Sequence, residues 1–291
     1  MQINRGKKIM AKIERQHQRE LDAKLRSKNF EEVACGFTLD QAQTEAQRCL
    51  NCKTAPCIKG CPVSVDIPNF IQAIKAGDID LADSIIKRTN NLPGICGRVC
   101  PQESQCESLC VRRKMEGAVS IGTLERFAAD NARQEKQYDK KITCAKKAAI
   151  IGSGPAGLTC AADLAAANVD VTVFEAFHKS GGVLVYGIPE FRLPKKLVQK
   201  EIDGLIKLGV KIKLNTVIGK TILMEELLSE YDAIFIGTGA GLPVFLNIPG
   251  ENLNGVYSAN EYLTRVNLMK AYLPDSSTPI YKGKNVAVLG A

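Results

Sequence analysis

The chain has 291 residues, 45% of them hydrophobic and 24% charged, and a formal net charge of +8. This length predicts two domains, and because no apolar stretch is long enough to cross a bilayer, the sequence predicts a cytoplasmic protein without membrane contact. The only histidines are His17 and His178, so the composition offers little for imidazole acid–base catalysis and favours chemistry carried by cofactors. No basic patch is interleaved with aromatic residues, and nucleic acid is therefore not a predicted partner.

Residues 1–30 are predicted to form a basic N-terminal arm. The segment from Lys7 to Lys28 is dense in Lys, Arg, Glu and Gln and has few apolar positions. This composition is typical of a solvated helix or arm, which we expect to dock on something else.

Residues 31–135 are predicted to be a small all-helical domain. Thr38 and Gln41 have the spacing of a capping box, which opens a helix that runs to Arg48. Apolar residues at helical spacing predict further helices from Asp66 to Gly77, from Asp80 to Lys87, and after Ser120.

Eight of the 11 cysteines lie in two runs within this domain, Cys49-x2-Cys52-x4-Cys57-x3-Cys61-Pro62 and Cys96-x3-Cys100-Pro101-x4-Cys106-x3-Cys110. Iron–sulfur clusters are held by thiolates that local turns bring together, and a bacterial ferredoxin motif also ends in C-x3-C-P. Structural zinc usually requires two short C-x2-C knuckles, and only Cys49 and Cys52 have that spacing. Disulfides are disfavoured by the odd number of cysteines and by the lack of a secretory signal. The pattern favours iron–sulfur clusters, with structural zinc as the alternative.

Residues 136–147 are a polar, lysine-rich linker, after which the pattern changes to strands and helices. The apolar run from Ala148 to Ile151 predicts a buried parallel strand, and it leads directly into Gly152-Ser153-Gly154-Pro155-Ala156-Gly157 and a helix to Ala167. Such glycines let backbone amides approach a pyrophosphate at the start of a helix. The next strand, Asp170 to Phe174, ends in Glu175, which suits a free ribose hydroxyl and so favours FAD or NAD over NADP. A glycine-rich connector without a ligand is the alternative.

Two later segments are also predicted to be strands. The run from Tyr231 to Ile236 is predicted to be buried and to lead into Gly237-Thr238-Gly239, where backbone and ligand can again come close. Residues 285–291 predict a strand that runs into the first glycine of a second dinucleotide fingerprint. Because a natural domain rarely ends within a motif, we expect the chain to be part of a longer protein.

Residues 49–127, the glycine-rich fingerprint and the stretch from Gly181 to Lys195 together resemble the small (beta) subunit of NADPH-dependent glutamate synthase. The same module occurs in dihydropyrimidine dehydrogenase, in sulfide dehydrogenase and in the NADPH-binding subunit of NADH-dependent ferredoxin:NADP reductase. The resemblance implies an α plus α/β fold, in which a helical domain with two [4Fe–4S] clusters precedes a Rossmann-like FAD-binding domain. The FAD-binding domain is expected to occupy residues 148–284 and to be incomplete, and residues 285–291 would be the first strand of a truncated NADPH-binding domain.

The resemblance also implies site residues. One cluster would be held by Cys49, Cys52, Cys57 and Cys110, and the other by Cys61, Cys100, Cys106 and Glu125. The alternatives for Glu125 are an ion pair with Arg98 or Arg112, or exposure at a helix edge. The remaining cysteines, Cys35, Cys96, Cys144 and Cys160, are expected to be small buried thiols. The residues expected at the FAD are Gly152, Ser153, Gly154, Pro155, Ala156, Glu175, Gly182, Val183, Leu184, Arg192, Ile218, Thr238 and Gly239.

The function implied is that of an oxidoreductase subunit that passes electrons from NADPH through FAD and two [4Fe–4S] clusters to a partner. Glutamate synthase small chain, with a large catalytic subunit as partner, is the preferred interpretation. The alternatives are the bifurcating reductase, with ferredoxin among its partners, sulfide dehydrogenase, or a non-catalytic electron-transfer and docking module. No side chain is expected to act as a catalytic acid, base or nucleophile. The NADPH site would lie mostly beyond residue 291, so this chain alone is expected to be inactive with NADPH.

Overall fold

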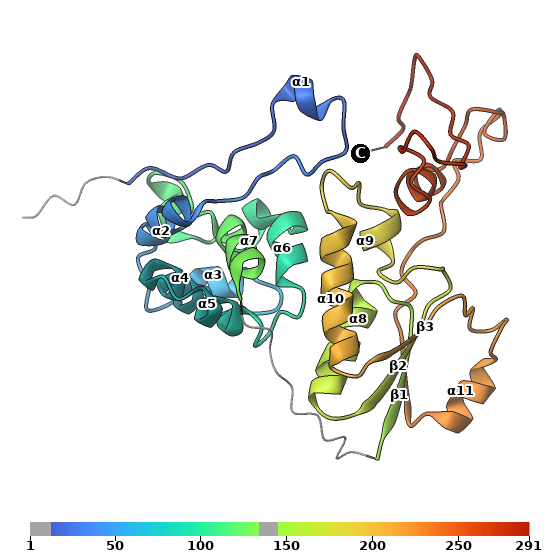
Figure 1. The fold of residues 1–291 in the computed structure, drawn as a ribbon, viewed down its shortest axis with the longest axis horizontal. Helices are drawn as coiled ribbons and strands as arrows, with labels where there is room; N and C mark the ends of the chain where they lie inside the picture. The colour runs from blue at the N-terminus through green and yellow to red at the C-terminus, as the bar shows by residue number, and fades with distance from the viewer. Residues whose placement is uncertain (1–12, 134–144, 291) are drawn as a thin grey trace, which may run out of the picture. The chain divides into compact units, whose positions relative to one another are not determined.

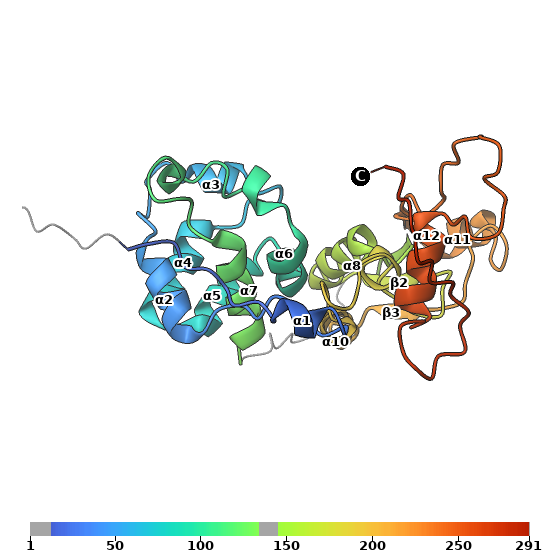
Figure 2. The same ribbon diagram turned by 90° about the horizontal axis from the view of Figure 1, so that it is seen from above.

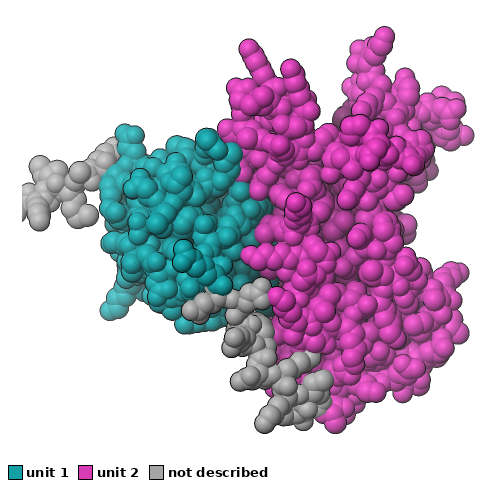
Figure 3. All heavy atoms as spheres, in the orientation of Figure 1, with its two compact units in different colours: residues 1–19, 35–135 teal, residues 20–34, 136–291 magenta. Residues whose placement is uncertain are grey.

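The computed structural model describes residues 13–133 and 145–290. The contacts divide the chain into two compact units, and Figure 3 colours them separately. The helical unit comprises residues 1–19 and 35–135, and the sheet unit comprises residues 20–34 and 136–291. The predicted boundary at residue 30 differs from this division, because residues 20–34 group with the sheet unit. Most of the predicted linker, and Cys144 with it, lies outside the described residues.

The helices of the helical unit begin and end close to the predicted positions. Thr38 and Gln41 form the capping box of α2, and Gly77 ends α4 with a positive φ of 84°. The helix α6 was not predicted, because its two glycines interrupt the apolar spacing. The helices are α2 (Leu39–Gln47), α3 (Pro56–Lys59), α4 (Ile67–Ala76), α5 (Ile79–Ile86), α6 (Pro93–Val99) and α7 (Ile121–Asn131).

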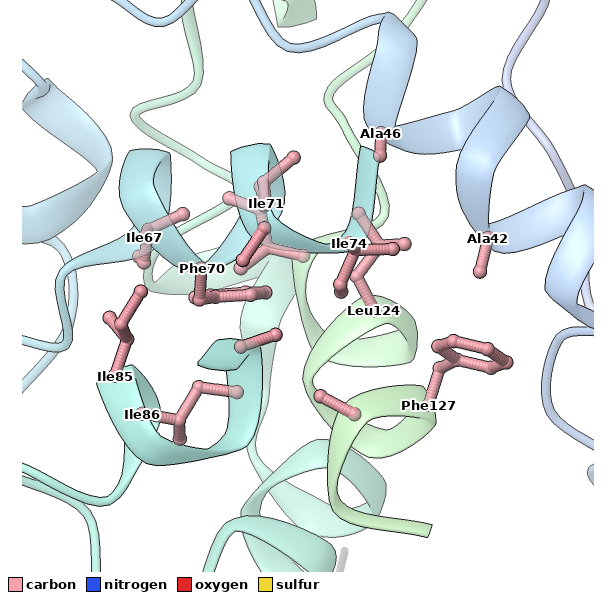
Figure 4. Packing of buried hydrophobic residues seen from close by; sticks show 14 of the residues in the cluster. Ala42, Ala46, Ile67, Phe70, Ile71, Ile74, Ile85, Ile86, Leu124 and Phe127 are labelled. Carbon is pink, nitrogen blue, oxygen red and sulfur yellow. The ribbon is translucent and has the colours of Figure 1, made fainter. Parts of the chain in front are cut away.

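One hydrophobic core holds these helices together. Figures 1 and 2 show α4, α5 and α7 beside one another, and Figure 4 shows the side chains between them and α2. Phe70, Ile74 and Leu124 have no exposed surface in this core. Four of the predicted ligands pack against its edge, namely Cys49, Cys57, Cys61 and Cys110. The cysteine-bearing loops are therefore attached to a packed helical support.

An ion pair without exposed surface lies directly before Cys49. Nη1 of Arg48 is 2.6 Å from Oε1 of Glu45. The Arg48 guanidinium also donates to the carbonyl oxygens of Ile13, Glu116, Gly117 and Ala118. The Glu45 carboxylate accepts from the backbone N–H groups of Gln16 and Ser120. This network joins the start of the first cysteine run to the segment that precedes α7.

The predicted N-terminal arm is mostly extended. Within residues 13–30 only Ala23–Arg26 (α1) is helical, and Asp22 caps it. Arg15 forms a 2.7 Å ion pair with Glu107, and the backbone N–H of Gln16 donates to the Glu45 carboxylate. Residues 13–19 therefore pack on the helices of the helical unit.

The sheet unit contains a parallel sheet with the strand order β3-β2-β1-β4. Its strands are β1 (Lys147–Ile151), β2 (Asp170–Phe174), β3 (Lys211–Lys213) and β4 (Ala233–Ile236). In Figure 1, α8 (Pro155–Ala166) and α10 (Lys195–Lys207) lie on one side of the strands and α11 (Met224–Glu230) on the other. The short helices α9 (Val183–Tyr186) and α12 (Ala259–Leu263), with a π-helical turn at Thr264–Leu268, complete the unit. This arrangement agrees with the predicted class of an all-helical part followed by a Rossmann-like part.

Two strand predictions require correction. The segment before Gly237 does form β4, but it was predicted to be buried, whereas Ile236 is 63% exposed. β4 is an edge strand, so one of its sides has no neighbouring strand in the described residues. Residues 285–290 are not a strand, and among the described residues no strand pairs with them to satisfy their backbone groups. Within residues 13–133 and 145–290, no helix has the length and apolar character needed to span a membrane.

Candidate cofactor sites

The first predicted set of ligands gathers at one cavity of about 30 Å³. Cys49 follows α2, Cys57 lies in α3, and Cys52 lies in the turn between them. Cys110 joins them from the second cysteine run, and apolar side chains such as Ile71 and Val119 complete the lining. The turns therefore bring two distant parts of the sequence to one place, as the predicted crossover of ligands requires.

The electrostatics of this cavity favour binding of a positively charged group. Burial, with the Cys110 and Cys49 thiols as further causes, raises the pKa of Cys57 to about 11, and burial likewise raises the pKa of Cys49. Gathering thiolates here is costly unless cationic iron offsets their charge. Nε2 of Gln72 is buried beside the Cys49 sulfur, where it acts to lower the pKa of that thiol, and it has no other hydrogen-bond partner among the described residues. A cluster thiolate or sulfide would give this amide an acceptor, so the residues present fit an iron–sulfur cluster.

The second predicted set gathers around Glu125 on α7. Burial, followed by the charges of Glu107, Glu125 and Cys61, raises the pKa of Cys106 to about 12. Burial also raises the pKa of Glu125 to about 8, and the neighbouring Cys100 adds to this shift. A carboxylate placed among thiols without a cation is poorly stabilised, and iron would supply that cation.

Neither predicted alternative for Glu125 is present. Arg98 binds Asp130 through two contacts of 2.9 and 2.8 Å, and Arg112 pairs with Glu116 at 3.0 Å. Glu125 is partly buried rather than exposed at a helix edge, and its carboxylate accepts a 2.7 Å hydrogen bond from the side-chain amide of Asn90. Sequence reasoning missed Asn90, because a polar residue in the turn after α5 carries no signal that distinguishes it from an ordinary turn residue.

The other cysteines differ from prediction. Cys35, Cys96 and Cys160 were expected to be buried, but each is partly exposed. Cys96 also hydrogen-bonds to Cys100, and this bond lowers the pKa of Cys100 to about 7.

Within residues 13–133 and 145–290, there is no group of three or more His, Cys, Asp or Glu side chains close enough together to hold a single metal ion. A four-iron cluster differs from a single ion in that its ligands bind separate irons at its corners.

The glycine-rich loop after β1 lies at the carboxyl end of the sheet, where α/β proteins bind ligands. Gly152 has a φ of +99°, and a Cβ there would lie 2.4 Å from the carbonyl oxygen of Gly237. A Cβ on Gly157 would lie 2.0 Å from the oxygen of Gly152. By contrast, a Cβ on Gly154 would meet no atom within 4 Å. The first and third glycines are required by the fold of the loop, while Gly154 leaves open space at the start of α8, which fits a pyrophosphate.

Glu175 is buried beside this loop and binds Ser153. Its Oε2 accepts from the Ser153 backbone N–H at 3.0 Å and from the Ser153 hydroxyl, and its Oε1 accepts from the Phe177 N–H at 2.9 Å. The Ser153 hydroxyl in turn accepts from the N–H of Gly181 at 2.9 Å. Glu175 therefore ties the loop to the end of β2 and to the Gly181–Gly182 turn, and its role towards a ribose stays a prediction.

Most of the other predicted FAD residues surround the same loop. Pro155 and Ala156 begin α8, and a Cβ on Gly182 would lie 2.7 Å from Cα of Gly154. Val183 and Leu184 begin α9 after Gly182, Val183 with an exposed and Leu184 with a buried side chain, while Thr238 and Gly239 follow β4. Ile218 packs against a core cluster that includes Leu227 of α11, and the side chain of Arg192 is exposed, so the roles of both residues towards FAD stay predictions.

Residues 146–291, half of the chain, match the family described as pyridine nucleotide-disulphide oxidoreductase. The chain belongs to this family. Residues 26–137 match a second family, described as dihydropyrimidine dehydrogenase domain II, 4Fe-4S cluster. The chain therefore combines a part similar to a 4Fe–4S domain with a part of the pyridine nucleotide-disulphide oxidoreductase family, and the predicted fold class is confirmed.

Curated relatives extend the similarity over most of the chain. It is 39% identical to the putative oxidoreductase AegA of Escherichia coli over 91% of this chain and 41% of AegA. It is 38% identical to the NADPH glutamate synthase small chain of Halomonas elongata over 96% of this chain and 60% of that protein. It is 39% identical to the PreT subunit of NAD-dependent dihydropyrimidine dehydrogenase of E. coli O157:H7 over 74% of this chain and 54% of PreT. The predicted resemblance to the glutamate synthase small chain is confirmed, and the chain spans about half the length of these relatives.

Proposed function

We propose that this chain is part of an oxidoreductase subunit that passes electrons from NADPH through FAD and two [4Fe–4S] clusters to a partner subunit. The observation that carries the proposal is the gathering of the predicted ligands into two groups, one around the cavity at Cys49 and one around Glu125. Their presence in one chain with the glycine-rich loop matches electron transfer between a dinucleotide and a one-electron acceptor.

The ligands of each cluster and of FAD are assigned in this proposal to separate sets of residues. Cys49, Cys52, Cys57 and Cys110 hold one cluster, and Cys61, Cys100, Cys106 and Glu125 hold the other. When bound, FAD accepts two electrons from a nicotinamide and releases them one at a time. The loop at Gly154 and the start of α8 bind the FAD pyrophosphate, and the network of Glu175 and Ser153 fixes the loop in position.

We place this chain with the glutamate synthase small chains, whose partner is a large catalytic subunit in the cytoplasm. The length of the match supports this choice, because it covers 60% of such a small chain at 38% identity, compared with 41% of AegA and 54% of PreT. A ferredoxin-coupled bifurcating reductase or a sulfide dehydrogenase would use the same cofactors with another acceptor. A non-catalytic electron-transfer and docking module would bind clusters without NADPH turnover.

The first test is the metal content of protein prepared without oxygen. We expect about eight irons per chain, for two four-iron clusters, and two distinct cluster signals in electron paramagnetic resonance. Stoichiometric zinc without iron would overturn the proposal.

The second test identifies the acceptor. The longer protein, combined with its large subunit, should oxidise NADPH only when 2-oxoglutarate and a nitrogen donor are present, whereas this chain alone should not oxidise NADPH. NADPH oxidation that requires ferredoxin and NAD⁺ instead would favour the bifurcating reductase.

A further inference from the structure

Asn90 is a buried residue in the turn after α5, beside the predicted second cluster site. Its side chain is the only part of the molecule among the described residues that hydrogen-bonds to the Glu125 carboxylate, with a distance of 2.7 Å from Nδ2 to Oε1. Asn90 itself is only 6% exposed. Burying a side-chain amide lowers the stability of the fold unless its polar atoms form hydrogen bonds. The hydrogen-bond partners of Asn90 therefore indicate its role.

The orientation of the Asn90 amide is fixed by its oxygen. Oδ1 accepts a hydrogen bond from the backbone N–H of Leu92 at 3.0 Å. Because the N–H of Leu92 can only donate, a flipped amide would turn its NH2 group towards another donor. Nδ2 must therefore point at Glu125.

The nearby arginines bind another carboxylate, so the Glu125 carboxylate is bound by the neutral amide of Asn90. Arg98 and Arg126 both bind Asp130, one turn further along α7. An arginine at Glu125 would neutralise the carboxylate and compete with a metal for it, whereas an amide orients one oxygen and leaves the negative charge for a cation. Partners of this kind hold metal ligands in position in many protein sites.

We propose that Asn90 is a positioning residue for the Glu125-ligated cluster: it binds Oε1 of Glu125 and thereby presents Oε2 to iron. This inference rests on the proposed function, because it requires Glu125 to be a ligand. It adds a residue outside the cysteine motifs, and it makes the turn between α5 and α6 part of the second cluster site.

The test is Asn90→Asp in the complete, cluster-loaded protein. Aspartate keeps an oxygen that can accept from Leu92, so the turn is retained, but it removes the donor and places a negative charge beside Glu125. We expect iron to be lost to a chelator about 10- to 100-fold faster from the Glu125-ligated cluster, with the all-cysteine cluster unchanged. We also expect the reduction potential of the Glu125-ligated cluster to change and that of the all-cysteine cluster to stay the same. Redox titration followed by electron paramagnetic resonance measures both potentials.

A matched control is Asn69→Asp. Asn69 also donates to a carboxylate at 2.7 Å, that of Asp66, but this bond is exposed. The control should leave both clusters unchanged. If Asn90→Asp lowers only the unfolding midpoint and leaves both potentials and both chelation rates as they were, Asn90 has a purely structural role and the inference is wrong.

Glu125→Ala separates this failure from failure of the proposed function. If Glu125→Ala releases one cluster and Asn90→Asp does not affect it, ligation stands and only the role of Asn90 is refuted. If Glu125→Ala leaves both clusters intact, Glu125 is not a ligand and both proposals fail at this site.

Discussion

At the scale of single residues, the buried pair of Glu45 and Arg48 offers a direct measure of how the first cysteine run is held. Removing one partner of a buried ion pair leaves an uncompensated charge and costs about 3–5 kcal/mol. We expect Glu45→Ala to lower the free energy of unfolding by this amount, measured by urea unfolding of the cluster-loaded protein. Glu20→Ala is the control, because its pair with Arg26 is exposed and should contribute less than about 1 kcal/mol. Equal effects of the two substitutions would contradict the role given to Glu45.

Lys195 gives a pH-dependent prediction in the sheet unit. Its Nζ donates to the carbonyl oxygens of Ile188 and Leu193 at 2.6 and 2.7 Å, and burial lowers its pKa from 10.5 to about 8. Between these two values the unfolded chain binds more protons than the folded chain, so this lysine makes stability rise with pH from about 8 to 10.5. The stability difference between the wild type and Lys195→Met should therefore shift in favour of the wild type between pH 8 and pH 10. A difference that is constant over this range in urea unfolding would refute the prediction.

At the scale of elements, local signals in the sequence predicted local structure well. The capping box at Thr38 and the glycine stop at Gly77 act within one helical turn, so they identified α2 and α4 with nearly correct ends. The strand, glycine loop and helix at β1 and α8 were likewise predictable, because Gly152 and Gly157 stand where the loop has no room for a side chain. The exposure of β4 was missed, because an apolar run does not reveal whether its strand lies at the centre or the edge of a sheet.

The candidate sites show the same division between local and distant information. Spacing identified the cysteines, and family resemblance assigned them to two groups that the structure brings to two places. Asn90 could not be predicted, since its contact with Glu125 joins residues 35 positions apart and depends on how α5, α6 and α7 pack.

The β1–α8 turn provides a prediction at this scale. Gly157→Ala would place a methyl group 2.0 Å from the Gly152 oxygen, so the turn must open, and we expect a loss of about 1–3 kcal/mol together with weaker FAD binding. Gly204→Ala in α10 is the control, because no atom lies within 4 Å of its added Cβ. In a helix interior this change should stabilise by about 0.5–1 kcal/mol. Flavin fluorescence titration and urea unfolding of both variants measure the two effects, and an unchanged flavin affinity in Gly157→Ala would contradict the prediction.

At the scale of the whole molecule, the two units depend on different sources of stability. The core of α2, α4, α5 and α7 is packed from apolar side chains, but the cysteine-bearing segments contain only short pieces of helix, such as the four-residue α3. Helices this short are not stable by themselves in water. Metal–thiolate bonds would therefore supply much of the order in these segments, whereas the sheet unit has its own hydrogen-bonded strands.

Iron removal should consequently loosen one unit and spare the other. Lys53 and Lys59 in the first cysteine run, and Arg113 after the second, are exposed and offer sites for trypsin. We expect rapid cleavage at these residues after chelation under anaerobic conditions and slow cleavage in the iron-loaded protein, because trypsin requires an extended, mobile backbone. Lys200 and Lys207 in α10 are the internal controls, and their cleavage rates should not depend on iron. Mass spectrometry of timed digests distinguishes the two groups of sites. Identical digestion patterns with and without iron would contradict this prediction. They would show that the apolar core alone orders the cysteine-bearing segments.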